Sequence, residues 1–136
     1  MRGRGRPASP ITLTLPGRPR STKNSRKIVR VRGQLRSVMS DTAAVCVKEA
    51  RVSLREQWKG RPLQVPAGVQ VHVVFANRRS LPDPDNVLNF TLDVLKGIAL
   101  QDDSLACIPT LALTHEIASG AQECVRVTLT PQEPQP

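Results

Sequence analysis

The sequence has 136 residues and a formal net charge of +9, and eleven of its basic residues come before the first acid, Asp41. This length favours a single domain with one modest core, and the uneven basic excess predicts a polyanionic partner, with nucleic acid ahead of an anionic membrane surface. The composition excludes a membrane span, a secretory signal and a disulfide or zinc framework built on the three cysteines, and the 2% aromatic content argues against base stacking and favours recognition of phosphates or shape.

The N-terminal third is predicted to be basic and largely irregular. Residues 1–10 contain arginine, glycine and proline with nothing to bury, which predicts a flexible basic arm. Its Arg4-Gly5-Arg6-Pro7 resembles the core of a minor-groove AT-hook, but a non-specific basic tail is the preferred interpretation of so short a basic motif. Residues 11–15 alternate with period two and predict a short strand, followed by a basic loop to residue 27 and by a second strand or ribbon around Gly33.

Regular elements are predicted through the rest of the chain. We expect a helix from about residue 41 to 59, a strand over 69–75, a helix over about 86–96, and two strands near 111–117 and 124–130 that form a hairpin through Ser119-Gly120. Residues 131–136 are predicted to be a disordered tail. The fold class is therefore α/β (α+β), in which a small mixed sheet of about four to five strands packs against two main helices in one domain over residues 11–130.

The 86–96 helix is predicted to be largely buried. At ~100° per residue, its polar residues fall within an arc of about 80°, and apolar residues and Thr91 fill the remaining sector. These polar residues are Asn86, Asn89, Asp93 and Lys96. A solvated helix has a wider polar face, so this helix is expected to form the floor of a site.

Acidic residues are concentrated around this helix. Five of the eleven acids lie within residues 83–103, with Asp83 and Asp85 before the helix and Asp102 and Asp103 after it. Carboxylates held close together repel one another, and oxygen ligands favour Mg²⁺, with Mn²⁺ as a possible substitute. The structural alternatives are a surface turn at Asp102-Asp103 and, at Asp83-Pro84-Asp85-Asn86, a turn that leaves Asp85 or Asn86 as the helix cap.

The order of these motifs resembles that of the RusA-type Holliday junction resolvases over roughly residues 10–130. The basic loop contains Gly17-Arg18-Pro19-Arg20 and Lys23-Asn24-Ser25, and it precedes Asp83-x-Asp85-Asn86, an amphipathic helix and Asp102-Asp103. The resemblance implies an Mg²⁺-dependent endonuclease that works as a homodimer and nicks opposing strands of a four-way DNA junction symmetrically. It also implies a cytoplasmic, nucleoid-associated protein of a bacterial cell or a phage-infected host.

The resemblance also assigns roles to residues. Asp83, Asp85 and Asp103 match the essential acidic positions of the family as catalytic residues and metal ligands; Asp102 is the flanking metal ligand, and Asp93 matches a common acid on the helix. We expect the nucleic-acid contacts to come from ten basic or amide side chains: Arg18, Arg20, Lys23, Asn24, Arg26, Lys27, Arg30, Asn86, Asn89 and Lys96.

One position departs from the family pattern. Well-studied members carry a catalytic lysine where this chain has Asn89, and Lys96 lies about 10 Å further along the helix axis. Either a basic residue of the 18–27 loop supplies the charge, or turnover is slow, or specificity has changed.

Two other functions are compatible with parts of the pattern. A non-catalytic basic protein with a degenerate site would bind branched DNA or RNA through the N-terminal third, with the acids as caps. A nucleotide or sugar transferase using the Asp-x-Asp pair would need a glycine-rich phosphate loop, which the sequence lacks.

Overall fold

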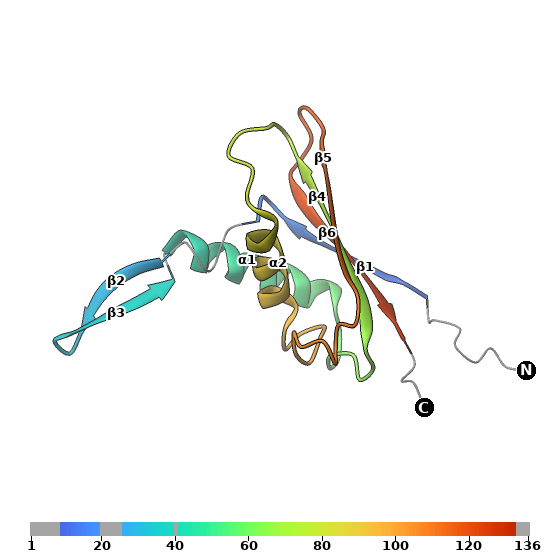
Figure 1. Cartoon of the computed structure of the whole chain (residues 1–136), viewed down its shortest axis with the longest axis horizontal. Helices are drawn as coiled ribbons and strands as arrows, with labels where there is room; N and C mark the ends of the chain where they lie inside the picture. Colours follow the sequence, from blue (N-terminus) through green and yellow to red (C-terminus); the bar gives the residue numbers. More distant parts are fainter. Residues whose placement is uncertain (1–8, 20–25, 40, 133–136) are drawn as a thin grey trace, which may run out of the picture.

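The chain forms an α+β structure. The computed structural model describes residues 9–19, 26–39 and 41–132, and for residues 26–29, 31, 36–39 and 41–43 it describes the backbone alone. A four-stranded mixed sheet carries two helices, and a separate two-stranded ribbon precedes them (Figure 1). The predicted fold class is confirmed. Residues 1–8 of the predicted arm over 1–10, and residues 133–136 of the predicted tail over 131–136, lie outside the described residues.

Alternating apolar residues place the sheet against the core. The strand order is β1 (Ile11–Pro16), β6 (Cys124–Pro131), β4 (Ala67–Phe75) and β5 (Leu111–Ile117). β6 pairs antiparallel with both β1 and β4, and β4 pairs parallel with β5. Because side chains alternate between the faces of a strand, every second residue of β1, β4 and β6 enters the same core.

The predicted hairpin between the last two strands is wrong, although both strands exist. β4 lies between β5 and β6, so residues 118–123 cross the end of β4 instead of joining two neighbouring strands. The Ala118 amide donates to the Phe75 carbonyl at the end of β4, which fixes this crossing. β4 is mostly apolar and takes one of the two central positions, whereas β5 is mostly exposed and forms one edge.

The predicted ribbon around Gly33 is confirmed. β2 (Arg26–Val31) pairs antiparallel with β3 (Gln34–Met39), and Arg32 and Gly33 join them with φ values of 51° and 80°. Two central residues with positive φ are typical of a type I′ turn, whose twist matches that of paired strands. The ribbon projects away from the sheet and continues into the first helix (Figure 1).

Both helices cover one face of the sheet. α1 (Asp41–Gln57) packs against β1 and against α2 (Pro84–Leu95). The described structure continues beyond the predicted domain end, since Pro131 belongs to β6 and the Gln132 amide donates to the Pro66 carbonyl. None of the helices within the described ranges is both long and apolar enough to cross a lipid bilayer.

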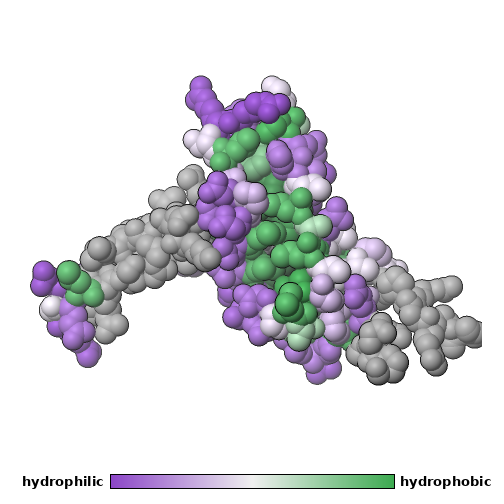
Figure 2. Space-filling model, viewed as in Figure 1, coloured by the Kyte–Doolittle hydropathy of each residue, from purple (hydrophilic) through white to green (hydrophobic). Residues whose placement is uncertain are grey.

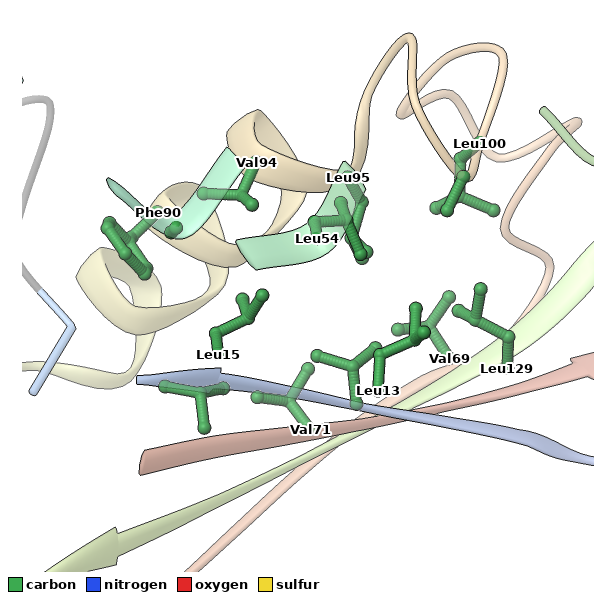
Figure 3. Packing of buried hydrophobic residues seen from close by; sticks show 14 of the residues in the cluster. Leu13, Leu15, Leu54, Val69, Val71, Phe90, Val94, Leu95, Leu100 and Leu129 are labelled. Carbon is green, nitrogen blue, oxygen red and sulfur yellow. The ribbon is translucent and has the colours of Figure 1, made fainter. Parts of the chain in front are cut away.

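The prediction that α2 is largely buried is confirmed. Val87, Phe90, Val94 and Leu95 are at most 4% exposed. They belong to one buried cluster with Leu54 of α1. Figure 3 shows Phe90, Val94 and Leu95 of α2 above the apolar side chains of the sheet. Burial of this stripe, more than helix propensity, therefore fixes where the two ends of α2 lie.

The connection through α2 sets the geometry of the acidic residues. Parallel strands require a crossover, and α2 with its flanking loops provides it between β4 and β5. Residues 76–83 follow the carboxyl end of β4, and residues 96–110 lead to the start of β5, which pairs with the opposite part of β4. The acids before and after α2 therefore lie toward opposite ends of the β4–β5 pair.

The α1–α2 packing predicts unequal effects for two residues on α1. Leu54 is 0% exposed in the core, so Leu54→Ala should lower the free energy of unfolding by about 2–5 kcal/mol. Val52 is 51% exposed, and Val52→Ala should change it by no more than about 0.5 kcal/mol. Urea denaturation of both variants measures the difference, and equal losses would contradict this packing.

Candidate active site

The first acidic pair lies at the N-terminus of α2. Asp83 is the N-cap residue, Pro84 is the first helical residue, and Asp85 lies in the first turn. The prediction that Asp85 or Asn86 caps the helix is wrong: Pro84 favours extended backbone at the residue before it, so the helix begins at Pro84 itself. The Asp83 side chain makes no capping hydrogen bond, and the Asp83 carbonyl accepts the amides of Asn86 and Val87. Both carboxylates are exposed.

The second acidic pair lies beyond the C-terminus of α2. Lys96 Nζ is 3.4 Å from Asp102 Oδ1 and 3.8 Å from Asp103 Oδ1. The Asp103 amide donates to Asp102 Oδ1 at 2.8 Å. This backbone hydrogen bond, followed by the side chains of Asp103 and Lys96, lowers the pKa of Asp102 below its ordinary value. Asp102 is therefore ionised at neutral pH, and Asp102 and Asp103 share the Lys96 ammonium.

The length of α2 separates the two pairs. Its 12 residues at ~1.5 Å each span about 18 Å, with Asp83 before the first residue and Lys96 after the last. Within residues 9–19, 26–39 and 41–132 there is no group of three acidic, histidine or cysteine side chains able to hold a metal ion. Each pair alone has suitable chemistry, because Mg²⁺ takes one or two carboxylates together with water and substrate phosphates. The described residues therefore carry two separate acidic pairs, one at each end of α2.

An arginine from α1 holds the C-terminus of α2. Arg51 Nη2 donates to the Asp93 carbonyl at 2.6 Å and to the Lys96 carbonyl at 3.3 Å. The last turn of α2 contains no basic residue, so Arg51 supplies from outside the positive charge that a helix C-terminus favours. No local pattern in the sequence shows that α2 packs beside Arg51.

A second arginine holds the loop that leads to the N-terminus of α2. Arg18 Nη2 lies 2.6 Å from Glu123 Oε2, and Nη1 donates to the carbonyls of Arg79 and Ser80. Arg18 Nη2 also donates to Asn77, and the guanidinium lies 4.9 Å from the centroid of the Phe75 ring. These contacts are all internal, and the predicted contact of Arg18 with nucleic acid stays a prediction.

Glu123 accepts hydrogen bonds both from Arg18 and from the end of β4. Its Oε2 also accepts the Ala76 amide at 3.0 Å. The Arg18 hydrogen bond and then the Ala76 amide lower the pKa of Glu123 below its ordinary value of 4.5. Glu123 lies 105 positions from Arg18 in the sequence, and no sequence signal pairs the two residues.

The other predicted nucleic-acid contacts are dispersed. Arg30 is exposed on the ribbon, and only the backbone of Arg26 and Lys27 is described there. Arg20, Lys23 and Asn24 lie outside the described residues. On α2, Asn86 is 9% exposed and Asn89 is half-buried, whereas the neighbouring Lys96 is exposed.

The comparison with protein families decides the class of the chain. The family model described as endodeoxyribonuclease RusA matches residues 16–128.

The chain belongs to the RusA endodeoxyribonuclease family. A search of curated proteins finds no match. Both acidic pairs, Arg18, Arg51 and Glu123 all lie within the matched segment. The family consists of endonucleases that act on branched DNA junctions.

The contacts of Arg51 predict a stability effect at α2. Arg51→Ala leaves two carbonyls at the helix C-terminus without their charged donor, so the free energy of unfolding should fall by about 1–2 kcal/mol. Arg55→Ala on the same helix removes an exposed side chain and is the matched control, with an expected change within about 0.5 kcal/mol. Chemical denaturation measures both, and equal values would contradict the role of Arg51.

The lowered pKa of Glu123 predicts a pH-dependent stability. A carboxyl with a depressed folded-state pKa stabilises the fold above its unfolded value, here about 4.5, and this contribution is lost as the pH falls through the folded-state pKa. The stability difference between wild type and Glu123→Gln should therefore be largest near about pH 7 and shrink toward about pH 3. Thermal denaturation across this range measures it, and a constant difference would contradict the pairing.

Proposed function

We propose that the chain is an Mg²⁺-dependent endonuclease that resolves four-way DNA junctions by paired symmetric nicks as a homodimer. The observation that carries this proposal is the pair of exposed carboxylates at each end of a buried helix, in a chain of a DNA endonuclease family. The family fixes the class of reaction. The carboxylates supply the chemistry that phosphodiester cleavage needs.

The proposed metal ligands are Asp83 and Asp85 at one end of α2 and Asp102 and Asp103 at the other. When bound, Mg²⁺ supplies Lewis-acid chemistry to phosphodiester hydrolysis. The chain itself keeps Asp102 ionised through the Asp103 amide and Lys96, and holds the Asp83 backbone in position at the helix N-terminus. Lys96 offers an exposed ammonium beside the carboxylates, where it can contact a DNA phosphate.

A second copy of the chain is proposed to complete the site. If two α2 helices lie antiparallel about a two-fold axis, the N-terminal pair of one chain faces the C-terminal pair of the other. Two composite sites then form about 18 Å apart, the length of α2. Half-buried Leu88 and Leu92 of α2 and exposed Leu81 and Leu111 supply apolar contacts, and Figure 2 shows hydrophobic residues gathered in the middle of the face that carries α2.

The ribbon is proposed to bind the DNA backbone. Arg30 and Arg32 are exposed there, Arg26 and Lys27 lie on the same strand, and the ribbon projects from the body (Figure 1). Phosphates are contacted by such arginines and lysines without sequence preference, which suits recognition of a branched structure. Asn89 and Lys96 are proposed to contact the DNA near the acids; Arg18 and the buried Asn86 are left out of the interface.

Removal of the carboxylates tests the catalytic proposal. Asp83→Asn with Asp85→Asn, or Asp102→Asn with Asp103→Asn, should lower Mg²⁺-dependent nicking of a synthetic four-way junction at least about 100-fold. Junction binding should stay equal or become tighter, because negative charge is removed. Glu56→Gln on the exposed side of α1 is the matched control and should nick like wild type. Binding by wild type without nicking in Mg²⁺ or Mn²⁺ would instead support the non-catalytic alternative.

Mixing the two double variants tests the composite site. If each site takes one pair from each chain, half of the dimers in an equal mixture are hybrids with one intact site, so about a quarter of wild-type nicking should return. If all four ligands come from one chain, the mixture stays inactive. The readout is nicking of a labelled junction after co-refolding, and an inactive mixture would reject the shared site.

A further inference from the structure

The Arg18 guanidinium donates its hydrogen bonds to groups inside the protein. Its side chain is 19% exposed, and Nε, Nη1 and Nη2 all donate within the fold. A guanidinium has five N–H donors and no acceptor, and here they meet the Glu123 carboxylate on one side and loop oxygens on the other. A phosphate contact by Arg18 would have to break this arrangement.

Apart from Glu123, the acceptors of Arg18 belong to one loop. The carbonyls of Asn77, Arg79 and Ser80 all lie between the end of β4 and the first acid of α2. The Arg79 amide donates to Asn77 Oδ1 at 2.9 Å, so the Asn77 side chain also folds the loop onto itself. Asp83 follows Ser80 by only three residues, which means that the path of this loop sets the position of the first acidic pair.

Glu123 and Gly17 hold Arg18 in place. Glu123 accepts from Arg18 and from the Ala76 amide, so one carboxylate joins the end of β4 to the segment that follows β1. Its backbone carbonyl accepts the Gly17 amide at 2.9 Å. Gly17 has φ +82°, a conformation that strains other residues, and it turns the chain directly after β1 so that Arg18 faces the loop.

We propose that Arg18 and Glu123 are positioning residues for DNA cleavage, which hold the Asn77–Ser80 loop so that Asp83 and Asp85 reach the metal and the scissile phosphate. This inference rests on the proposed function. Charge-assisted hydrogen bonds to several carbonyls fix a loop more strongly than neutral ones. A misplacement of about 1 Å at a catalytic site can cost about 100-fold in rate.

The test compares Arg18→Lys, Arg18→Ala and Glu123→Gln with Arg126→Ala, which removes an exposed positive charge from β6. Lysine keeps the charge but cannot donate to Glu123 and three carbonyls at once. Arg18→Lys and Arg18→Ala should therefore both lower kcat about 10- to 100-fold and raise the Mg²⁺ concentration for half-maximal nicking, while KM stays within about two-fold. Glu123→Gln should lower kcat less, and Arg126→Ala should match wild type.

Binding and hydrogen exchange separate this role from DNA contact. Junction affinity measured without divalent metal, and its salt dependence, should be unchanged in the Arg18 variants. Amide exchange should increase in residues 76–82 and stay as in wild type in α1. Weakened binding that Arg18→Lys rescues would assign Arg18 to the DNA and overturn the proposal, and so would unchanged kcat and exchange.

The same measurements distinguish failure of the proposed endonuclease function from failure of the positioning role of Arg18 and Glu123. If wild type nicks no junction, the proposed function fails, and faster exchange in residues 76–82 of the variants still establishes the loop contacts. If Arg18→Ala does not fold, the milder Arg18→Lys and Glu123→Gln carry the test, with thermal denaturation confirming that they are folded.

Discussion

The burial of α2 is the constraint on which the rest of the structure depends. Its apolar stripe packs between α1 and the sheet, so the helix cannot move along or around its axis without exposing Phe90, Val94 and Leu95. Each acidic pair is attached to one end of this fixed element. The distance of about 18 Å between the ends follows from the number of helical residues, and it is the reason that the described part of the chain gathers no three side chains able to hold a metal ion.

Both ends of α2 depend on an arginine that comes from another element. Arg51 of α1 donates to the last carbonyls of the helix, and Arg18 after β1 donates to carbonyls of the loop before it. A planar guanidinium suits this task because its fork of donors reaches several oxygens in fixed directions, which a lysine ammonium does not. The basic residues of this chain therefore do not form a uniform basic surface, because Arg18 and Arg51 donate their hydrogen bonds within the fold.

The sequence predicted the elements well and their long-range partners poorly. The alternation in β1, β4 and β6 and the narrow polar arc of α2 are local periodic signals, and the structure confirmed the strands and the buried helix. The β5–β6 hairpin failed because a turn signal at Ser119-Gly120 does not reveal that β4 lies between the strands. The roles of Arg18 and Glu123 were missed for the same reason, since residues 105 positions apart share no local pattern. The candidate acids came from their clustering and from the family resemblance, but their separation along α2 required the fold.

The separation of the acids has an electrostatic advantage for the free chain. Two carboxylates at 4 Å repel by about 4 kcal/mol at an effective dielectric of 20, and four in one place would repel more strongly. In the free chain each pair stays apart from the other, and Lys96 lies beside Asp102 and Asp103 as an internal cation. In the proposed dimer, the pairs meet only where a metal ion can offset the repulsion, and Lys96 lies at the same place to face the DNA phosphate. Dimer assembly then favours metal binding because it brings the negative carboxylates together, and the positive metal favours binding of the negative DNA phosphate.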